Sequence, residues 1–382
     1  MPKNKPSYVR VMDGLKDRIK DEEFDRQTPF TTEEKVTQEY DVSRITAIRA
    51  LKELEKEGII YRKRGSGSFV TKNAKNVIEG KKIHKIASPK IDDDGKARLV
   101  ALVLPFNVHL GGMMECFKGI NEVFNSANCY VNLFDSERSF EKEAEILKSL
   151  LERNIDAVIC NPIQNDRNIE IYNQFMMNNV PIVLIDKYIE NFPISYVVSD
   201  NFGGASMLCE YAIKQGRKKI GFISQAELTE TSTIKERYLG YTTQLVEHGM
   251  ETGLNLVKVG LKNKTVPEQA HENMIQAMDS LIDSGVDAVM CQNDWVALEF
   301  VEECERKGVR IPEEILVLGF DNLTELNKKH GSDKIVTVKQ DFYEMGVRAG
   351  KMILKALNDK NGMCIRNVVP VTLVDRTKGK EI

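Results

Sequence analysis

The sequence predicts an α/β fold in two parts, a small three-helix unit with a β-hairpin and a larger unit of two parallel sheets. Three observations carry this prediction. Residues 7–72 show a helical apolar period followed by a basic hairpin. From residue 97 onward, continuous apolar strands alternate with helical segments, which is typical of parallel sheets covered on both faces. The two parts also carry opposite net charge.

The first part begins with a helix over residues 8–20, because apolar residues recur there at helical spacing. Thr31 or Thr32 can cap a second helix that runs to Tyr40. Ser43 is a good N-cap for a third helix, which ends near Gly58. On a helical wheel, the side of this third helix predicted to face the core consists of Ala47, Ala50, Leu51 and Leu54.

The opposite side of the third helix is basic and is predicted to be exposed. It carries Arg44, Ile45, Ile48, Arg49 and Lys52. Two strand-like segments, residues 59–62 and 68–71, follow it and are joined by a basic, glycine-rich tip that includes Arg64. A basic helix beside such a hairpin suits a helix in the DNA major groove with a wing next to it. The alternative, a plain three-helix unit with a surface hairpin, has less support.

The motifs of this part resemble the winged helix-turn-helix of the gluconate-repressor (GntR) family of bacterial regulators. They are Val-Ser-Arg-x-Thr, Ala-Leu-x-x-Leu-x-x-x-Gly and a Gly-x-Gly wing that ends in Phe-Val. The resemblance implies DNA contacts by Ser43, Arg44 and Thr46 and by the wing-tip glycines. Together with the basic residues around them, the predicted DNA-binding residues are Ser43, Arg44, Thr46, Arg49, Arg62, Arg64, Gly65 and Gly67. Glu34 and Ile48 stand where relatives often have arginine, so the operator sequence cannot be copied from them.

The charge distribution separates a basic head from an acidic body. Residues 1–90 carry a net charge of +7, and the remaining residues carry −10. This asymmetry favours a polyanion partner for the head, although a solvated lysine-rich surface would look the same. We expect a DNA-binding domain over residues 1–72, a linker over 73–96, and a two-lobed effector-binding and dimerisation domain over 97–382.

In the body, two series of apolar strands predict two lobes. The expected strands of the first series are 99–104, 130–134, 156–160, 181–185 and 195–198, and those of the second are 219–223, 287–291 and 315–320. Ligands of open parallel sheets bind beyond the carboxyl ends of the strands. The polar residues there are therefore candidate ligand contacts, although a single Asp or Asn after a strand is as often a helix N-cap, and Asp294 is better explained as a structural residue.

The motifs of the body resemble the effector domain of the lactose-repressor/galactose-repressor (LacI/GalR) family, itself similar to periplasmic sugar-binding proteins. They include Val-Val-Ser-Asp-Asn, Gly-Arg-Lys-Lys-Ile-Gly-Phe-Ile, Arg-x-x-Gly-Tyr, Gln-Asn-Asp and Leu-Gly-Phe-Asp-Asn. The resemblance implies a two-lobed, periplasmic-binding-protein-like parallel-sheet domain. The effector-binding residues implied by it are Phe106, Lys187, Asp200, Arg237, Asn293, Asp321 and Gln340. Lys187 stands where an arginine is commoner.

A head of the first kind on a body of the second resembles the arabinose-repressor subgroup. We therefore expect a DNA-binding repressor of carbohydrate-utilisation genes. We expect it to form a homodimer and to bind a sugar-like effector that controls its affinity for DNA. The alternatives are a doubly wound enzyme and a stand-alone sugar-binding protein. No phosphate-binding, GxSxG or HExxH motif supports the enzyme, and no cofactor or metal is expected. The absence of CxxC spacing, signal peptide and long apolar run predicts a cytoplasmic protein.

Overall fold

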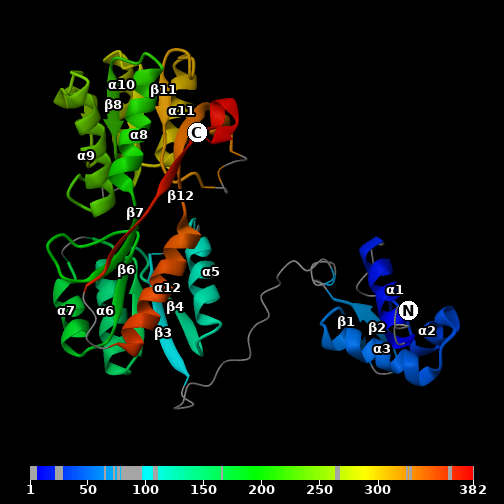
Figure 1. Ribbon diagram of the computed structural model, residues 1–382. Helices are drawn as coiled ribbons and strands as arrows, with labels where there is room; N and C mark the ends of the chain where they lie inside the picture. Colours follow the sequence, from blue (N-terminus) through cyan, green and yellow to red (C-terminus); the bar gives the residue numbers. More distant parts are fainter. Residues whose placement is uncertain are drawn as a thin grey trace. The chain divides into compact units, whose positions relative to one another are not determined.

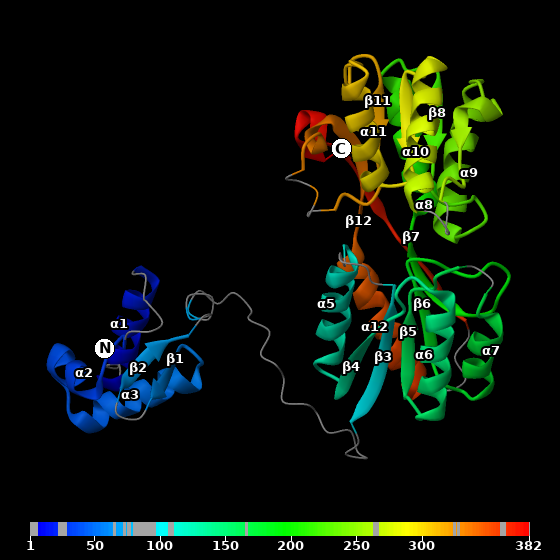
Figure 2. The same cartoon turned by 180° about the vertical axis from the view of Figure 1, so that it is seen from behind.

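The computed structural model divides the chain into two compact units, residues 1–87 and residues 88–382. Figures 1 and 2 show both units from opposite sides, and each unit is described by itself. The structure describes residues 7–21, 29–63, 66–71, 74, 78, 97–105, 111–164, 167–262, 267–323, 326, 329–359 and 364–381. The predicted linker over residues 73–96 lies outside these residues except at positions 74 and 78.

The smaller unit is built from helices that bury one face each. Its described elements are α1 (Ser7–Asp21), α2 (Glu33–Tyr40), α3 (Arg44–Lys56), β1 (Ile60–Lys63) and β2 (Gly67–Val70). The predicted core side of α3 is confirmed, since its four apolar residues are all fully buried. They pack with Val11, Leu15 and Ile19 of α1 in a single core cluster. The apolar residues that recur at helical spacing in the sequence are therefore the residues that form the core of this unit.

Polar caps fix where α2 and α3 begin. Thr32, not Thr31, caps α2, since its Oγ1 accepts a hydrogen bond from the backbone N of Lys35 at 3.2 Å. Ser43 caps α3 as predicted, because its Oγ accepts from the backbone N of Thr46 at 3.3 Å. Strands β1 and β2 pair antiparallel, and Thr31 adds an isolated bridge to Ser68. The sharp connection between α2 and α3 places the two helices as a helix-turn-helix.

The first lobe of the larger unit is a six-stranded parallel sheet with helices on both faces (Figure 1). The strand order is β13-β7-β6-β5-β3-β4. The strands are β3 (Arg98–Leu104), β4 (Cys129–Asp135), β5 (Ala157–Cys160), β6 (Ile182–Ile185), β7 (Ser195–Ser199) and β13 (Arg366–Val369). One face is covered by α5 (Met113–Phe124) and α12 (Phe342–Asn358), and the other by α6 (Phe140–Glu152) and α7 (Ile169–Met177).

The second lobe is a seven-stranded sheet in the order β15-β14-β12-β11-β10-β8-β9. Its strands are β8 (Ile220–Ile223), β9 (Val257–Lys258), β10 (Ala288–Cys291), β11 (Leu316–Leu318), β12 (Ile335–Gln340), β14 (Val371–Asp375) and β15 (Lys380–Glu381). Helices α8 (Asn201–Lys214) and α9 (Ser232–Glu247) cover one face, and α10 (Pro267–Asp283) and α11 (Asp294–Arg306) cover the other. Strand β14 runs antiparallel to both of its neighbours, β12 and β15, and the other strand pairs of this sheet are parallel.

The chain crosses between the lobes three times within the described residues. The crossings lie between β7 and α8, between β12 and α12, and between β13 and β14. Helix α12 consequently packs along α5, although more than 200 positions separate them, and Figures 1 and 2 show the two side by side. The expected two series of strands are confirmed, but the return of α12 and β13 to the first lobe was not foreseen from the strand pattern.

Among the described residues, no helix combines the length and the apolar character that crossing a bilayer demands.

Candidate functional site

The first turn of α3 presents a polar surface on the head. Arg44 has 79% of its side chain exposed, and Ile45 is 80% exposed. Ser43 and Thr46 lie on the same turn, where their hydroxyl oxygens are 2.9 Å apart. An exposed isoleucine between polar groups has no packing role in this unit, so its exposure fits contact with an apolar group such as a thymine methyl.

Arg49 lies one turn further along α3 and is exposed. Its guanidinium carbon is 4.1 Å from the ring centroid of Tyr8 on α1, a cation–π contact that fixes the side chain. The basic side of α3 is thus held in part by its neighbour helix, and its charged atoms remain at the surface.

A groove of about 950 Å³ separates the start of α2 from the start of α3 and the hairpin. Arg44 and Arg62 both line it, and both pair with Glu33, the first residue of α2. The distance from Arg44 Nη2 to Glu33 Oε2 is 3.4 Å, and Arg62 Nη2 donates a short hydrogen bond to Glu33 Oε1. The structure therefore brings the predicted arginines of the helix and of the hairpin to one carboxylate.

The hairpin tip depends on Gly67, whose φ of +109° is a conformation that side-chain-bearing residues rarely adopt. A Cβ atom here would also lie 3.1 Å from Pro29 Cβ and from the backbone oxygen of Thr31. The predicted contacts Arg64 and Gly65 lie outside the described residues.

In the second lobe, Arg237 of α9 is the centre of a buried polar cluster. Its side chain donates to Asn201 Oδ1 at 2.9 Å, to the backbone oxygen of Gln292 at 2.5 Å and to Asp321 Oδ1 at 3.2 Å. Gln340 Nε2 donates to the same Asp321 oxygen at 2.6 Å. Three residues that the resemblance implied, Arg237, Asp321 and Gln340, are thus brought together at the carboxyl ends of β11 and β12.

Asp321 carries both backbone strain and an altered acidity. Its φ is +103°, far outside the usual regions for a residue with a Cβ atom, and such residues cluster at functional sites. Burial raises the pKa of Asp321 to about 6, although Arg237 opposes this shift. The negative charge of Asp186 in the first lobe also raises the pKa of Asp321, so a carboxylate of one lobe acts on a carboxylate of the other.

Asn293 and Asp200 are helix N-caps in this structure. Asn293 Oδ1 accepts from the backbone N of Val296 at 3.1 Å, at the start of α11. Asp200 Oδ1 accepts from the backbone N of Gly203 at 2.8 Å, at the start of α8. Each cap is next in the sequence to a residue that accepts a hydrogen bond from Arg237. Asn201, which follows Asp200, accepts through Oδ1, and Gln292, which precedes Asn293, accepts through its backbone oxygen.

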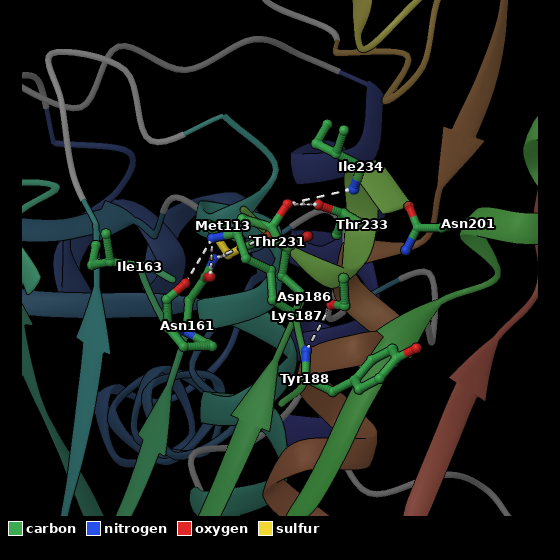
Figure 3. A network of polar contacts seen from close by, with 12 residues as sticks. Met113, Asn161, Ile163, Asp186, Lys187, Tyr188, Asn201, Thr231, Thr233 and Ile234 are labelled. Carbon is green, nitrogen blue, oxygen red and sulfur yellow. Dashed lines mark hydrogen bonds and ion pairs between the residues drawn. The ribbon is translucent and has the colours of Figure 1, made fainter. Parts of the chain in front are cut away.

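In the first lobe, Lys187 belongs to a second polar network at the ends of β5 and β6 (Figure 3). Its Nζ donates to Asn161 Oδ1 at 2.7 Å and to the backbone oxygen of Pro162 at 3.0 Å. Asn161 Nδ2 donates in turn to Asp186 Oδ2 at 3.2 Å. Burial lowers the pKa of Lys187. The two hydrogen bonds of its Nζ hold the side chain in place as a hydrogen-bond donor.

Direct contacts join the two lobes beside this network. The backbone N of Tyr188 donates to Ser232 Oγ at 3.0 Å, and its hydroxyl donates to Glu236 Oε1 at 2.8 Å. Lys235 and Glu190 add an ion pair of 2.7 Å. Figure 3 shows Asp186, Lys187 and Tyr188, which follow β6, near Thr231 and Thr233 at the start of α9. A pocket of about 360 Å³ also has walls from both lobes; it is lined by Gln164, Arg167, Gln225, Glu227, Thr229, Glu230, Gly260 and Lys262.

Asp294 is structural, as the sequence indicated. It is fully buried, accepts from Thr337 Oγ1 at 2.5 Å and pairs with Arg376 at 3.1 Å. Phe106, the remaining predicted effector contact, lies outside the described residues.

Sequence reasoning missed Asn161 and Glu33 as members of these clusters. Asp186, like Lys187, was marked by its place after an apolar strand, and Asn161 holds the same kind of position after β5. Glu33 lies in the first turn of α2, and nothing in its local sequence shows that it pairs with Arg62.

Two protein-family models match the chain. Residues 7–70 match the family described as bacterial regulatory proteins, gntR family. Residues 209–377 match the periplasmic binding protein-like domain. The chain therefore carries a gntR-type DNA-binding domain and a periplasmic-binding-protein-like domain, which confirms both parts of the predicted fold class.

Two curated relatives match all or part of the chain. The arabinose metabolism transcriptional repressor of Geobacillus stearothermophilus is 23% identical over 388 residues, which span 100% of this chain and 99% of that protein. The transcriptional repressor PurR of Pasteurella multocida is 29% identical over 233 residues, or 60% of this chain and 66% of that protein.

Solved structures support the fold. The transcription regulator CcpA of Lactococcus lactis has a TM-score of 0.64 at 21% identity, covering 73% of this chain and 98% of its own. A complex of the transcriptional regulator CelR with cellobiose has a TM-score of 0.61 at 21% identity, covering 90% of this chain and 98% of its own.

Proposed function

Since the chain joins a gntR-type head to a periplasmic-binding-protein-like body, we propose that it is a DNA-binding transcriptional repressor of carbohydrate-utilisation genes. Its operator affinity is controlled by a sugar or a sugar-derived effector bound between the two lobes. The observation that carries the proposal is the union of both modules in one chain, together with similarity to an arabinose metabolism repressor over nearly the full length of both proteins. The protein acts in the bacterial cytoplasm, where its DNA lies, and by regulation rather than catalysis.

The head supports DNA binding through the first turn of α3 and the hairpin. Arg44, Ile45 and Thr46 offer donors and an apolar contact at the surface suited to a major groove. Arg49 lies further along α3, where it reaches a phosphate, and Arg62 lies on β1, where it shares the carboxylate of Glu33 with Arg44. Arg64, Gly65 and Gly67 complete the interface as the tip of the wing.

The body supports a polyhydroxylated ligand. Arg237, Asp321 and Gln340 supply both donors and acceptors in the second lobe, and Lys187 supplies a donor in the first. Such mixed groups bind vicinal hydroxyls in pairs. Phe106, Asp200 and Asn293 complete the proposed effector site. A ligand held by both lobes favours one lobe arrangement, and it changes operator affinity only if DNA favours another.

The active form is a homodimer whose two heads read a two-fold operator. Its support is a set of exposed apolar side chains on the packed pair α8 and α9. Phe202 is 42% exposed, Leu239 43% and Val246 68%. Sedimentation of the purified chain tests this directly, and a single species of 43.3 kDa at micromolar concentration would contradict it.

The test of the whole proposal has two stages. First, the purified chain selects preferred duplexes from a random DNA library, which yields the operator. Second, thermal unfolding is measured against monosaccharides, disaccharides, sugar acids, sugar phosphates and purines. A compound at 100 times its dissociation constant stabilises the body by about 2.7 kcal/mol. A compound that does so should also weaken operator binding, and the operator should weaken its binding by the same factor.

Failure at either stage is informative. A chain that selects no duplex is not a sequence-specific DNA-binding protein. A chain that selects a duplex but is stabilised by no compound in the panel has a different effector class.

A further inference from the structure

Glu33 connects the two elements of the head that carry the proposed DNA-contacting arginines. It is the first residue of α2, while Arg44 is the first residue of α3 and Arg62 lies in β1. One carboxylate oxygen faces Arg44 at 3.4 Å, and the other accepts the short hydrogen bond from Arg62. Three elements that are separate in the chain therefore share a single charge cluster in the groove of the head.

The two pairs differ in how firmly they are held. Glu33 and Arg62 are 28% and 29% exposed, so their pair is partly shielded from water, whereas Arg44 is 79% exposed. The backbone N of Arg62 also donates to Glu55 Oε1 at 3.2 Å. Arg62 is thus held by hydrogen bonds at both its backbone and its guanidinium. Among the residues that the structure describes, Arg44 is held only by its longer, more exposed contact with Glu33.

This arrangement affects two kinds of DNA contact in opposite ways. A DNA phosphate that approaches Arg44 or Arg62 must compete with the Glu33 carboxylate and is repelled by it. Glu33 therefore weakens the phosphate contacts, which are made with DNA of any base sequence. A base contact needs a guanidinium in one fixed orientation. Holding that orientation before binding reduces the conformational entropy lost when the contact forms.

We propose that Glu33 is a positioning residue that sets the specificity of DNA binding. It lowers the affinity for DNA of any sequence and keeps Arg44 and Arg62 oriented for base contacts in the preferred sequence. This inference rests on the proposed DNA-binding function.

The experiment uses the full chain and two duplexes of equal length and composition. One is the duplex that the wild-type chain selects from a random library, and the other is its scrambled sequence. Glu33→Gln keeps the size of the side chain and removes its charge. We expect tighter binding to the scrambled duplex and a fall of about tenfold in the ratio of the two affinities, as for the loss of one good base contact. The slope of log affinity against log salt should steepen by about one for each guanidinium released to a phosphate.

Glu34→Gln is the matched control. Glu34 is the next residue of α2, lines the same groove and undergoes the same change of charge. Its substitution should strengthen binding to both duplexes by a similar factor, since it acts only through long-range charge. Glu33→Asp keeps the charge on a shorter arm, so the affinity ratio should fall while the salt slope stays near that of the wild type.

The outcomes separate this inference from the function on which it rests. A wild-type chain that selects no duplex overturns the proposed function. A selected duplex whose affinity ratio is unchanged in Glu33→Gln, or is changed equally in Glu34→Gln, overturns the role of Glu33 alone. If Glu33→Gln unfolds the head, Glu33→Asp decides the question, and an unaltered ratio in that variant overturns the role.

Discussion

Arg237 shows how one side chain organises a site at the residue scale. It is 5% exposed, lies 3.7 Å above the ring of Phe320 and makes three hydrogen bonds from three different atoms of its guanidinium. A lysine has a single charged nitrogen and could not reproduce this planar set of contacts. The fixed position of Arg237 therefore also fixes Asp321 and the carboxyl end of β10.

Replacing Arg237 by leucine should destabilise the body strongly. The change leaves Asp321 buried without its cation, at a cost of about 3 kcal/mol. The same change in the exposed pair Arg310–Glu314 should cost much less, because water screens the attraction between these two side chains. Urea unfolding of the larger unit measures both variants. If Arg237→Leu and Arg310→Leu lowered the unfolding free energy equally, the buried cluster would contribute no more to stability than the exposed pair.

The carboxyl group of Asp294 should make stability depend on pH. Burial raises its pKa from the ordinary 3.8 to about 7, although Arg376 and Thr337 oppose the shift. Between about pH 4 and pH 7 the folded chain therefore holds a proton that the unfolded chain has released, so this group stabilises less as the pH rises through that window.

The variant Asp294→Asn removes this titration. Its unfolding free energy should vary less between pH 5 and pH 8 than that of the wild type, measured by urea unfolding at several pH values. Asp283→Asn, at a side chain that is 73% exposed, is the control and should keep the wild-type slope. A slope that is the same in all three proteins would contradict the assignment.

At the scale of elements, the wing depends on backbone geometry more than on side chains. Gly67 has a positive φ and would place a Cβ atom in tight contact at 3.1 Å, while Gly58 has a φ of +76° with no heavy atom within 4 Å of the corresponding position. The two glycines therefore separate backbone strain from crowding.

Gly67→Ala should destabilise the head by about 1 to 3 kcal/mol because it adds strain and crowding together. Gly58→Ala should cost about 1 kcal/mol through conformational strain alone. Thermal unfolding of the head, followed by circular dichroism, measures the difference. If Gly58→Ala lowered the unfolding free energy of the head more than Gly67→Ala does, small movements at the hairpin tip would have to relieve the crowding there.

The elements also show what the sequence can predict. Caps, helical periods and buried strands are local, so α3 with its core side, Ser43 as N-cap and eight strands of the body, β3 to β8, β10 and β11, followed from the pattern. Strands β9 and β12 to β15 were not predicted. The joining of Arg237 to Asp321 is not local, since 84 positions separate them, and here the family resemblance named both residues. The pairing of Glu33 with Arg62 depends on how the hairpin packs against α2, and no pattern in the sequence encodes that.

At the scale of the whole molecule, charge is divided between the two units. The basic head lies on an otherwise acidic chain, so only the head should attract a polyanion. DNA binding should therefore weaken steeply with salt, by about 0.9 in log affinity per log unit of salt for each phosphate contacted. Arg44→Ala should weaken operator binding without changing effector binding. Fluorescence titrations across a salt series test both statements, and a flat salt response would argue against a basic DNA-binding face.

The repeated crossing of the chain between the lobes has a consequence for synthesis. The head is complete once residue 87 has left the ribosome, but the first lobe lacks helix α12 and edge strand β13 until residue 369 has been made. Each nascent chain thus carries a finished head long before it carries a finished first lobe. A messenger that ends before codon 366 would encode a complete head joined to a first lobe that lacks its edge strand β13.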